Sequence, residues 1–336
     1  MIITNSRSGR RPWRLLVIAC AGLVAVGCSS SSSSTPAKPS GTANVAYAGS
    51  LANLNEKVIG PAFTKATHYS YLGRGAGSKA LSQEILAGEI SPNVFESIGG
   101  KPIEALYPKK FTSWYVSFAA SPLVVAYNPN SKYASDFKAI ASGTKPITDL
   151  FTLMEQPGFK LGRTDPNLDP QGEAFILMLM LAQKQYHLPA NTVTKIIQGQ
   201  PASANSPTIF EETALEPRLQ AGQLDAASAY LPQAIQLHLP YITLPNTINQ
   251  GDPALKTTYE GVSFKLASGD VAQGKPLVVD ITTIGKKDQA AADAFVAYVL
   301  SPAGLALHKA GGYVLLPRVA SGTAIPASVS KELGSG

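Results

Sequence analysis

The stretch Asn-Val-Ala-Tyr-Ala-Gly-Ser-Leu, residues 44–51, decides the fold class of this chain. Residues 44–48 predict a short β-strand, which the following Gly-Ser pair ends. Ser50 is a favoured helix N-cap, and residues 51–66 predict the helix that it begins. A strand that passes directly into a helix is the unit from which α/β sheets are built.

The same order of elements returns at once. Residues 68–72 predict a second strand, residues 73–77 a glycine-rich turn, and Ser78 the cap of a helix that ends near residue 87. Later strands are predicted at 93–97, 123–127, 160–162, 226–230 and 276–284, and helices at 170–186, 210–221, 289–300 and 303–310. This alternation predicts an α/β fold with mainly parallel sheets and helices on both faces, and 336 residues suffice for two such sheets.

Residues 1–28 have the pattern of a secretory signal. Its positive start contains the arginines at positions 7, 10, 11 and 14, and its apolar run, 15–26, is too short for a membrane span. Ala25-Val26-Gly27-Cys28 resembles the cleavage site of lipoproteins, with alanine where leucine is usual. We predict that residues 1–27 are a lipoprotein signal peptide and that the thiol of Cys28 accepts the lipid. The alternative is an ordinary cleaved signal or a short anchor.

The residues after Cys28 favour the lipoprotein. An unbroken serine run occupies 29–34, and the chain stays rich in Pro, Ser, Lys and Gly as far as residue 42. This composition predicts a flexible tether over 28–42. An anchored domain needs such a tether, so we expect an extracytoplasmic protein held at the cell membrane, in the periplasm or at the cell surface.

Charge and cysteine content exclude several classes of function. Without the four arginines of the signal, the chain has 24 basic and 22 acidic residues, a net charge of +2, which does not favour a nucleic-acid partner. The two cysteines are Cys20 and Cys28, so the mature fold can have no internal disulfide and no thiolate metal site. We expect each histidine at the surface or at a helix end, because the four lack the spacing of metal ligands. They are His68, His187, His238 and His308.

Two serines stand where a strand passes into a helix, and each follows a glycine. Ligands bind at the carboxyl ends of strands in open α/β sheets, and a helix N-terminus offers free N–H groups to an anion. Ser50 and Ser78 could therefore form a pocket for a compact oxyanion, with positive potential from Arg74 and Lys79. The alternative is that both serines are ordinary helix caps, which are common.

A family resemblance rests on short segments whose order and spacing are more specific than any one of them. They are Tyr47-Ala-Gly-Ser-Leu51, Trp114-Tyr-Val-Ser-Phe-Ala119, Val124-Val-Ala-Tyr127, Lys160-Leu-Gly162, Asp165-Pro-Asn-Leu-Asp-Pro-Gln-Gly172, Leu219-Gln-Ala-Gly222 before Asp225, Tyr230, Gly274-Lys-Pro-Leu-Val278 and Ser301-Pro-Ala-Gly304. Together they resemble the periplasmic solute-binding proteins for tungstate and molybdate, specifically the tungstate branch. The resemblance covers roughly residues 45–317.

The resemblance implies a two-lobed, type II periplasmic-binding-protein fold with the ligand in the cleft between two α/β lobes. The first lobe would contain residues 43–123 and 278–336, and the second residues 124–277. Two crossing strands would join the lobes, near 123–127 and near 277–284. Such lobes close over a ligand.

The resemblance also implies the site residues. Ser50 and Ser78 match the anion-binding serines of the first lobe, and Tyr230 matches a tyrosine that lines the cleft. Asp169 and Glu212 match two carboxylates that contact the metal of the bound oxyanion itself. The sequence departs from the family pattern at Tyr47, Asn93, Asp165, Leu168 and Gln171.

A carboxylate beside a dianion is attractive only for some anions. Two unit charges 4 Å apart repel by ~4 kcal/mol at an effective dielectric near 20. Sulfur in sulfate stays four-coordinate, whereas tungsten and molybdenum accept further oxygen ligands, and phosphate can donate its remaining proton to a carboxylate. The alternative is that Asp169 caps a helix and that Glu212 interacts with the dipole of a helix's first turn.

The sequence therefore predicts a monomeric binding protein, not an enzyme, with no cofactor other than its ligand, tungstate or molybdate. Its partner would be the permease of an ABC importer. Binding of sulfate, thiosulfate or phosphate is the alternative within the same class. A membrane-coupled sensor and a hydrolase that uses Asp169 and Glu212 as its two carboxylates are further alternatives. No nucleophile or metal motif supports the hydrolase.

Overall fold

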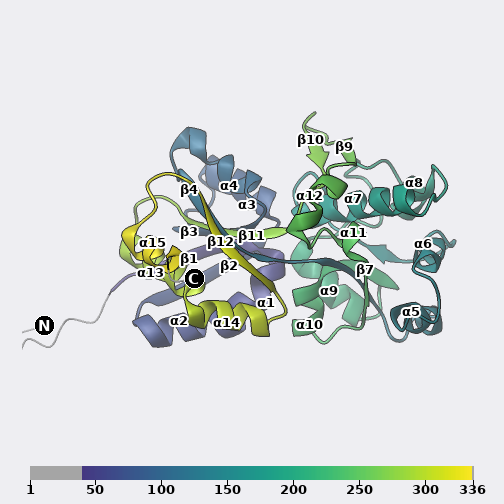
Figure 1. Ribbon diagram of the computed structural model, residues 1–336, viewed down its shortest axis with the longest axis horizontal. Helices are drawn as coiled ribbons and strands as arrows, with labels where there is room; N and C mark the ends of the chain where they lie inside the picture. Colours follow the sequence, from purple (N-terminus) through teal and green to yellow (C-terminus); the bar gives the residue numbers. More distant parts are fainter. Residues whose placement is uncertain (1–39, 335–336) are drawn as a thin grey trace, which may run out of the picture. The chain divides into compact units, whose positions relative to one another are not determined.

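The computed structural model describes residues 40–334, and two main sheets organise them (Figure 1). The predicted signal peptide, Cys28 and the tether as far as residue 39 lie outside the described residues. Among residues 40–334, no single helix has the length and composition of a membrane span, although α13 (Gln289–Leu300) and α14 (Pro302–Ala310) together, with a bend of 61° between them, meet both criteria.

The first sheet has six strands in the order β12-β4-β11-β3-β1-β2. Their bounds are β1 Thr42–Ala48, β2 Ser70–Ala76, β3 Val94–Ile98, β4 Trp114–Ala120, β11 Val278–Thr283 and β12 Val314–Gly322. β1 pairs in parallel with both β2 and β3, whereas β11 and β12 pair only antiparallel. We call this sheet with its helices the first lobe.

The second sheet has four strands in the order β6-β7-β5-β8. A separate two-stranded ribbon, β9–β10, follows these strands in the sequence. The bounds are β5 Leu123–Tyr127, β6 Leu161–Gly162, β7 Ala226–Tyr230, β8 Tyr241–Thr243, β9 Ser263–Lys265 and β10 Val271–Gln273. β6 and β7 are parallel, and β5 runs antiparallel to β7 and β8. We call this sheet with its helices the second lobe.

Helices cover both lobes. In the first lobe these are α1 Ala52–Leu54, α2 Gly60–Thr67, α3 Ser78–Ala87, α4 Lys101–Glu104, α13 Gln289–Leu300, α14 Pro302–Ala310 and α15 Ala327–Leu333, with the short turns η1 Gly49–Leu51, η2 Asn55–Ile59 and η3 Tyr107–Lys109. In the second lobe they are α5 Ala134–Ala141, α6 Thr148–Met154, α7 Pro170–Gln185, α8 Thr192–Ile196, α9 Glu212–Gln220, α10 Leu231–Gln236, α11 Asn246–Asn249, α12 Lys256–Tyr259 and η4 Pro253–Leu255.

The first sheet is buried on both faces. Leu81 and Ile85 of α3 pack with Ala46 and Phe95 on one face, while Phe63 of α2 and other helical residues fill the opposite face. Figure 1 shows α3 and α4 on one side of the sheet and α2 and α14 on the other. The two-lobed α/β fold is thus the architecture that the sequence predicts.

The strand directions correct one part of the prediction, because the sheets are mixed and not mainly parallel. The chain leaves the first sheet at residues 121–122 and returns at 274–277, where the Ser121 N–H donates to the Leu277 carbonyl, 2.9 Å away. The returning strand β11 therefore inserts antiparallel between β3 and β4. Residues 123–127 and 278–283, near which the crossings were expected, lie inside the two sheets. The exact division of residues between lobes stays a prediction.

The glycines of residues 73–77 do not all form a turn, as the sequence suggested. Gly73 and Gly75 belong to β2, where large side chains cross above them. A Cβ atom at Gly73 would lie 2.0 Å from Glu56 Oε1, and one at Gly75 would lie 2.7 Å from the Tyr47 ring. The glycines are needed for close packing on the strand, not for a bend.

Two further details differ from the prediction. The helix expected over 51–66 is divided into η1, α1, the π-turn η2 and α2. His308 lies in the last turn of α14 but is buried, with its Nδ1 2.9 Å from the Gly304 carbonyl. Burial lowers the pKa of His308 to about 4, so this side chain is a neutral core residue. His68, His187 and His238 follow helices in left-handed backbone conformation, as expected for helix ends.

Candidate functional site

Ser50 lies in η1, immediately after β1, and is 2% exposed. Its backbone N–H donates to Glu212 Oε1 of the second lobe, 2.8 Å away. Its side chain caps no helix, which excludes the capping alternative for this residue. The hydroxyl is buried and makes no hydrogen bond to any described residue. A buried hydroxyl without a partner costs free energy, so this group is available to a ligand.

Ser78 has a different role. It is the first residue of α3, and Gly77 occupies the N-cap position. The Ser78 hydroxyl accepts a hydrogen bond from the Ile98 N–H at 3.2 Å, at the end of β3. Ser78 therefore fixes α3 to the sheet. Its hydroxyl proton can still be donated to a ligand.

Asp169 begins α7, and its Oδ1 accepts from the Gln171 N–H at 2.7 Å. The predicted cap is thus confirmed, but it uses only one carboxylate oxygen. Oδ2 is buried and makes no well-aligned hydrogen bond within residues 40–334, although the Thr164 hydroxyl lies near enough to lower the pKa of Asp169. Gly77 lies against this residue, because a Cβ atom at Gly77 would be 3.1 Å from Asp169 Cβ. Ser78 and Asp169 thus belong to segments that touch.

Glu212 is the first residue of α9 and is buried. It packs on the backbone of Gly49, where a Cβ atom would lie 2.6 Å from Glu212 Oε2. This approach explains why glycine precedes Ser50. Oε2 makes no hydrogen bond to another described residue, so Glu212, like Asp169, presents one free carboxylate oxygen.

Tyr230 ends β7, and its buried hydroxyl is also unpaired within the described chain. Two glutamines, which sequence reasoning did not place in the site, hold this region. Gln233 Oε1 accepts from the Tyr230 N–H at 2.9 Å and from Gln171 Nε2 at 3.0 Å, and Gln171 Oε1 accepts from the Ser228 hydroxyl. This network joins the starts of α7 and α10 to β7.

The electrostatics of the site favour protonated carboxyl groups while no ligand is bound. Burial raises the pKa of Asp169 to about 7, and burial followed by the charge of Asp169 raises the pKa of Glu212 well above its usual value. Burial also raises the pKa of Glu216, one turn further along α9, to about 7. Sequence reasoning missed Glu216. A strongly positive centre placed between these oxygens would reverse the shifts.

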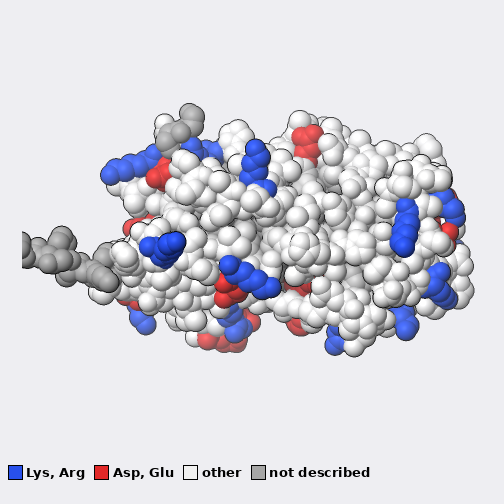
Figure 2. All heavy atoms as spheres, turned by 90° about the horizontal axis from the view of Figure 1, so that it is seen from below, with Lys and Arg blue, Asp and Glu red and all other residues white. Residues whose placement is uncertain are grey.

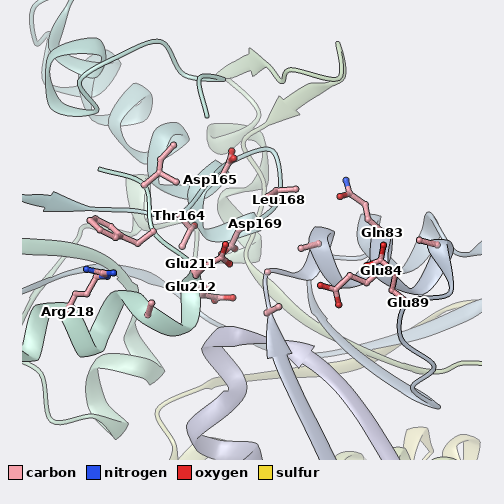
Figure 3. A pocket seen from close by; sticks show the side chains of 17 residues that line it. Gln83, Glu84, Glu89, Thr164, Asp165, Leu168, Asp169, Glu211, Glu212 and Arg218 are labelled. Atoms are coloured by element: carbon pink, nitrogen blue, oxygen red, sulfur yellow. The ribbon is translucent and has the colours of Figure 1, made fainter. Parts of the chain in front are cut away.

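A pocket of about 710 Å³ opens beside Asp169 and Glu212 (Figure 3). Figure 3 shows Asp165, Asp169, Glu211 and Glu212 on one side and Gln83, Glu84 and Glu89 on the other. Among the described residues that line it, Arg218 is the only basic one. Ser50, Ser78 and Tyr230 are buried and are not among the lining residues. The entrance is thus acidic.

Arg74 and Lys79, which were expected to add positive potential, are each paired with an acid that offsets their charge. Arg74 lies 2.7 Å from Glu84, and Lys79 contacts Glu173. On the face shown in Figure 2, basic side chains are scattered in separate groups and do not form a continuous basic area. No group of three or more His, Cys, Asp or Glu residues within 40–334 is arranged to hold a metal ion.

Comparison with known proteins identifies the family. The sequence profile of bacterial extracellular solute-binding proteins matches residues 43–314. The chain belongs to this family. One relative, from Haloferax volcanii, has the assigned name ABC transporter molybdenum-binding protein; it is 34% identical over 59% of this chain and 59% of its own length. The molybdate/tungstate-binding protein WtpA of Pyrococcus abyssi is 30% identical over 54% of this chain and 56% of its own.

A solved structure agrees on the fold. The periplasmic molybdate-binding protein of Azotobacter vinelandii superposes with a TM-score of 0.53 at 18% identity, covering 82% of this chain and 99% of that one. The matches span less than two thirds of the length of each of these two relatives. In this solute-binding protein, Glu212 accepts from the Ser50 N–H and interacts electrostatically with Asp169 and Tyr230. Gly77, which precedes Ser78, lies against Asp169.

Proposed function

We propose that this chain is the extracytoplasmic solute-binding subunit of an ABC importer and that its solute is tungstate or molybdate. One observation carries the proposal: four buried oxygens without hydrogen-bond partners lie in one site, and they come from both lobes. They are Ser50 Oγ, Asp169 Oδ2, Glu212 Oε2 and the Tyr230 hydroxyl. Family membership and the names of the two relatives support the same solute class.

The chemistry of the four groups suits an expandable oxyanion. Hydroxyls of Ser50 and Tyr230 would donate to the oxygens of the anion. The free oxygens of Asp169 and Glu212 would repel those oxygens but would bind a metal centre that accepts more than four ligands. The site could therefore hold a dianion next to two ionised carboxylates. A site for sulfate could not, because sulfur in sulfate accepts no further oxygen ligand.

Ligand capture would couple to lobe closure. The first lobe supplies Ser50, and the second supplies Asp169, Glu212 and Tyr230. A ligand that contacts both sets stabilises the closed arrangement over the open one by its differential contacts. The closed form would then dock on the permease and release the anion without chemical change.

Lipid anchoring through Cys28 is part of the proposal and is tested separately. Cys28→Ser should abolish incorporation of a radiolabelled fatty acid and release the protein from the membrane fraction. Retention of the label in this variant would contradict anchoring at Cys28 and leave the solute assignment untouched.

Isothermal titration calorimetry tests the solute. Residues 28–336 carrying Cys28→Ser would be titrated with tungstate, molybdate, sulfate and phosphate in turn. One-to-one binding of tungstate or molybdate, with no heat from sulfate, is the expected result. Binding of sulfate in preference to both would overturn the proposed coordination, and silence with all four would overturn the oxyanion assignment.

Hydrogen phosphate is the second candidate, because burial raises the pKa values of Asp169 and Glu212 and so favours a proton in the site. A carboxylate could accept the proton that hydrogen phosphate retains. Calorimetry distinguishes the two, since phosphate would then give the stronger signal and Asp169→Asn would weaken it by loss of an acceptor.

A further inference from the structure

We propose that Lys79 and Glu173 form a latch between the two lobes and that this latch controls how long the solute stays bound. The inference rests on the proposed function only for the second part, because the latch would act on the lobes with or without a solute. Lys79 is thus assigned as a positioning residue, not as a ligand of the anion.

The contact itself crosses the lobe boundary. Lys79 belongs to α3 of the first lobe and Glu173 to α7 of the second. The Lys79 ammonium contacts Glu173 Oε1, and it also donates to the carbonyl of Pro166, 3.2 Å away. The other ion pairs reported among residues 40–334 each lie within one lobe.

The latch lies next to the site in sequence but outside it in space. Lys79 follows Ser78, and Glu173 lies one helical turn after Asp169. Between them, the Ala80 N–H donates to the Leu168 carbonyl at 3.0 Å, so the two segments are also joined through their backbones. Lys79 and Glu173 line a separate pocket of about 850 Å³ and not the pocket of Asp169 and Glu212.

Burial distinguishes this pair from surface ion pairs. The side chains of Lys79 and Glu173 are 20% and 8% exposed, whereas those of Lys195 and Glu155 are 51% and 20% exposed. Charges shielded from water interact more strongly, and removal of one partner leaves the other buried and unpaired. Lys275, on the segment that returns to the first sheet, lines the same pocket as Lys79 and Glu173. Burial lowers the pKa of Lys275, and the charge of Glu173 opposes that shift. Glu173 therefore interacts with two cations, by direct contact with Lys79 and electrostatically with Lys275.

The consequence follows from the two-state behaviour of the lobes. Opening separates Lys79 from Glu173, so the pair stabilises only the closed arrangement. The apparent affinity is proportional to the fraction of molecules that can close, so it falls when that fraction falls. A bound solute leaves when the lobes open. Loss of the latch should therefore act mainly on the dissociation rate and equally on tungstate and molybdate.

Spin-label distance measurements without solute provide the first test. Because the mature chain has no cysteine after Cys28, Lys65→Cys on α2 and Lys138→Cys on α5 would give one label in each lobe of the Cys28→Ser protein. Lys79→Met and Glu173→Gln should each shift the distance distribution towards longer distances. Lys195→Met, which breaks an ion pair inside the second lobe, is the matched control and should leave the distribution unchanged.

Stopped-flow dissociation of tungstate provides the second test. Each single variant should release tungstate about 5 to 30 times faster than the parent protein, which is the range expected for a partly buried interaction of this kind. The double variant should release it no faster than the worse single variant, because both remove one interaction. Unchanged distances together with unchanged release in both single variants would overturn the latch. If the parent protein binds no tungstate, the proposed solute fails and the distance measurement alone decides the latch.

Discussion

The carboxylate of Glu212, on α9 of the second lobe, accepts a hydrogen bond from the backbone N–H of Ser50 in the first lobe, with 2.8 Å between the two atoms. The Glu212 carboxylate thus accepts from a backbone N–H that lies at the turn where the sequence predicts that an oxyanion binds. Binding of an oxyanion at this turn requires Glu212 to share or leave the Ser50 N–H. In the ligand-free protein, Glu212 therefore competes with the oxyanion for the Ser50 N–H. Substitution of Glu212 should affect both the ligand-free and the ligand-bound protein.

Glu212→Gln is expected to weaken tungstate binding by about a hundredfold, or ~2.7 kcal/mol, because an amide is a poor ligand for the metal. Calorimetry at pH 8 measures the loss. Glu211→Gln, on the exposed neighbour that lines the same pocket, is the control and should bind as the parent does. Equal affinities for Glu212→Gln and the parent would contradict coordination by this residue.

Gly49→Ala should reduce affinity without unfolding the protein. The added Cβ atom would lie 2.6 Å from Glu212 Oε2, which forces the carboxylate to move. Gly199→Ala is the matched control, because its nearest neighbouring atom would be 4.0 Å away. We expect a loss of about tenfold in tungstate affinity for Gly49→Ala, with a circular dichroism spectrum like that of the parent. A loss of the same size in Gly199→Ala would show that the effect is not local.

Ser50→Ala and Ser82→Ala should have opposite effects on the ligand-free protein. The Ser50 hydroxyl has no partner among residues 40–334, so its removal should leave the melting temperature unchanged or raise it. The Ser82 hydroxyl donates to the Pro102 carbonyl at 2.8 Å, and its removal should cost about 1 kcal/mol. Only Ser50→Ala should weaken tungstate binding. A destabilised Ser50→Ala protein would mean that this hydroxyl serves the fold.

Stability of the ligand-free protein should fall as the pH rises through neutrality. The pKa values of Asp169 and Glu216 are about 7 in the folded chain, above the values near 4 expected after unfolding. The folded chain then holds more protons between about pH 4 and pH 7, so this stabilisation is complete below pH 4 and is lost as the pH passes 7. Thermal melts at pH 5 and pH 8 measure the difference.

Asp169→Asn tests the source of this pH dependence, because asparagine caps α7 as well as aspartate does. The variant should lose less stability than the parent between pH 5 and pH 8. His308, whose pKa is about 4, acts in the opposite direction below about pH 6.5, and its contribution cancels in the comparison of variant with parent. Identical pH profiles for the two proteins would exclude Asp169 as a source.

The sequence predicted the two-lobed fold, and it named four of the residues that the structure places in the candidate site. The strand Leu123–Tyr127, the cap of α7 by Asp169 and the start of η1 after β1 depend on neighbours in sequence, so local patterns predict them. The family resemblance added Glu212 and Tyr230, which no local pattern distinguishes. The strand directions were predicted wrongly, because insertion of β11 between β3 and β4 depends on where the chain returns to the first sheet.

The missed features are contacts between the lobes. Ser50 and Glu212 are far apart in sequence, as are Lys79 and Glu173, and each pair forms only when two separately built sheets meet. Glu216 has the spacing of a residue on the buried face of a helix, so the sequence does not mark it. Its carboxyl group belongs to the candidate site only because the fold places it near Asp169. Gln171 appeared in the sequence as a departure from the family pattern, whereas the structure shows it holding Gln233 and Ser228 in place.

The two crossings at 121–122 and 274–277 determine the order in which the exported chain can assemble. All strands of the second sheet lie between residues 123 and 243, so that sheet can form while synthesis continues. β4 must wait for β11 and β12, which are the last strands to emerge. Until then its edge is unpaired, and unpaired edges recruit other chains. Molecules that stall before residue 278 should therefore aggregate through Trp114–Ala120.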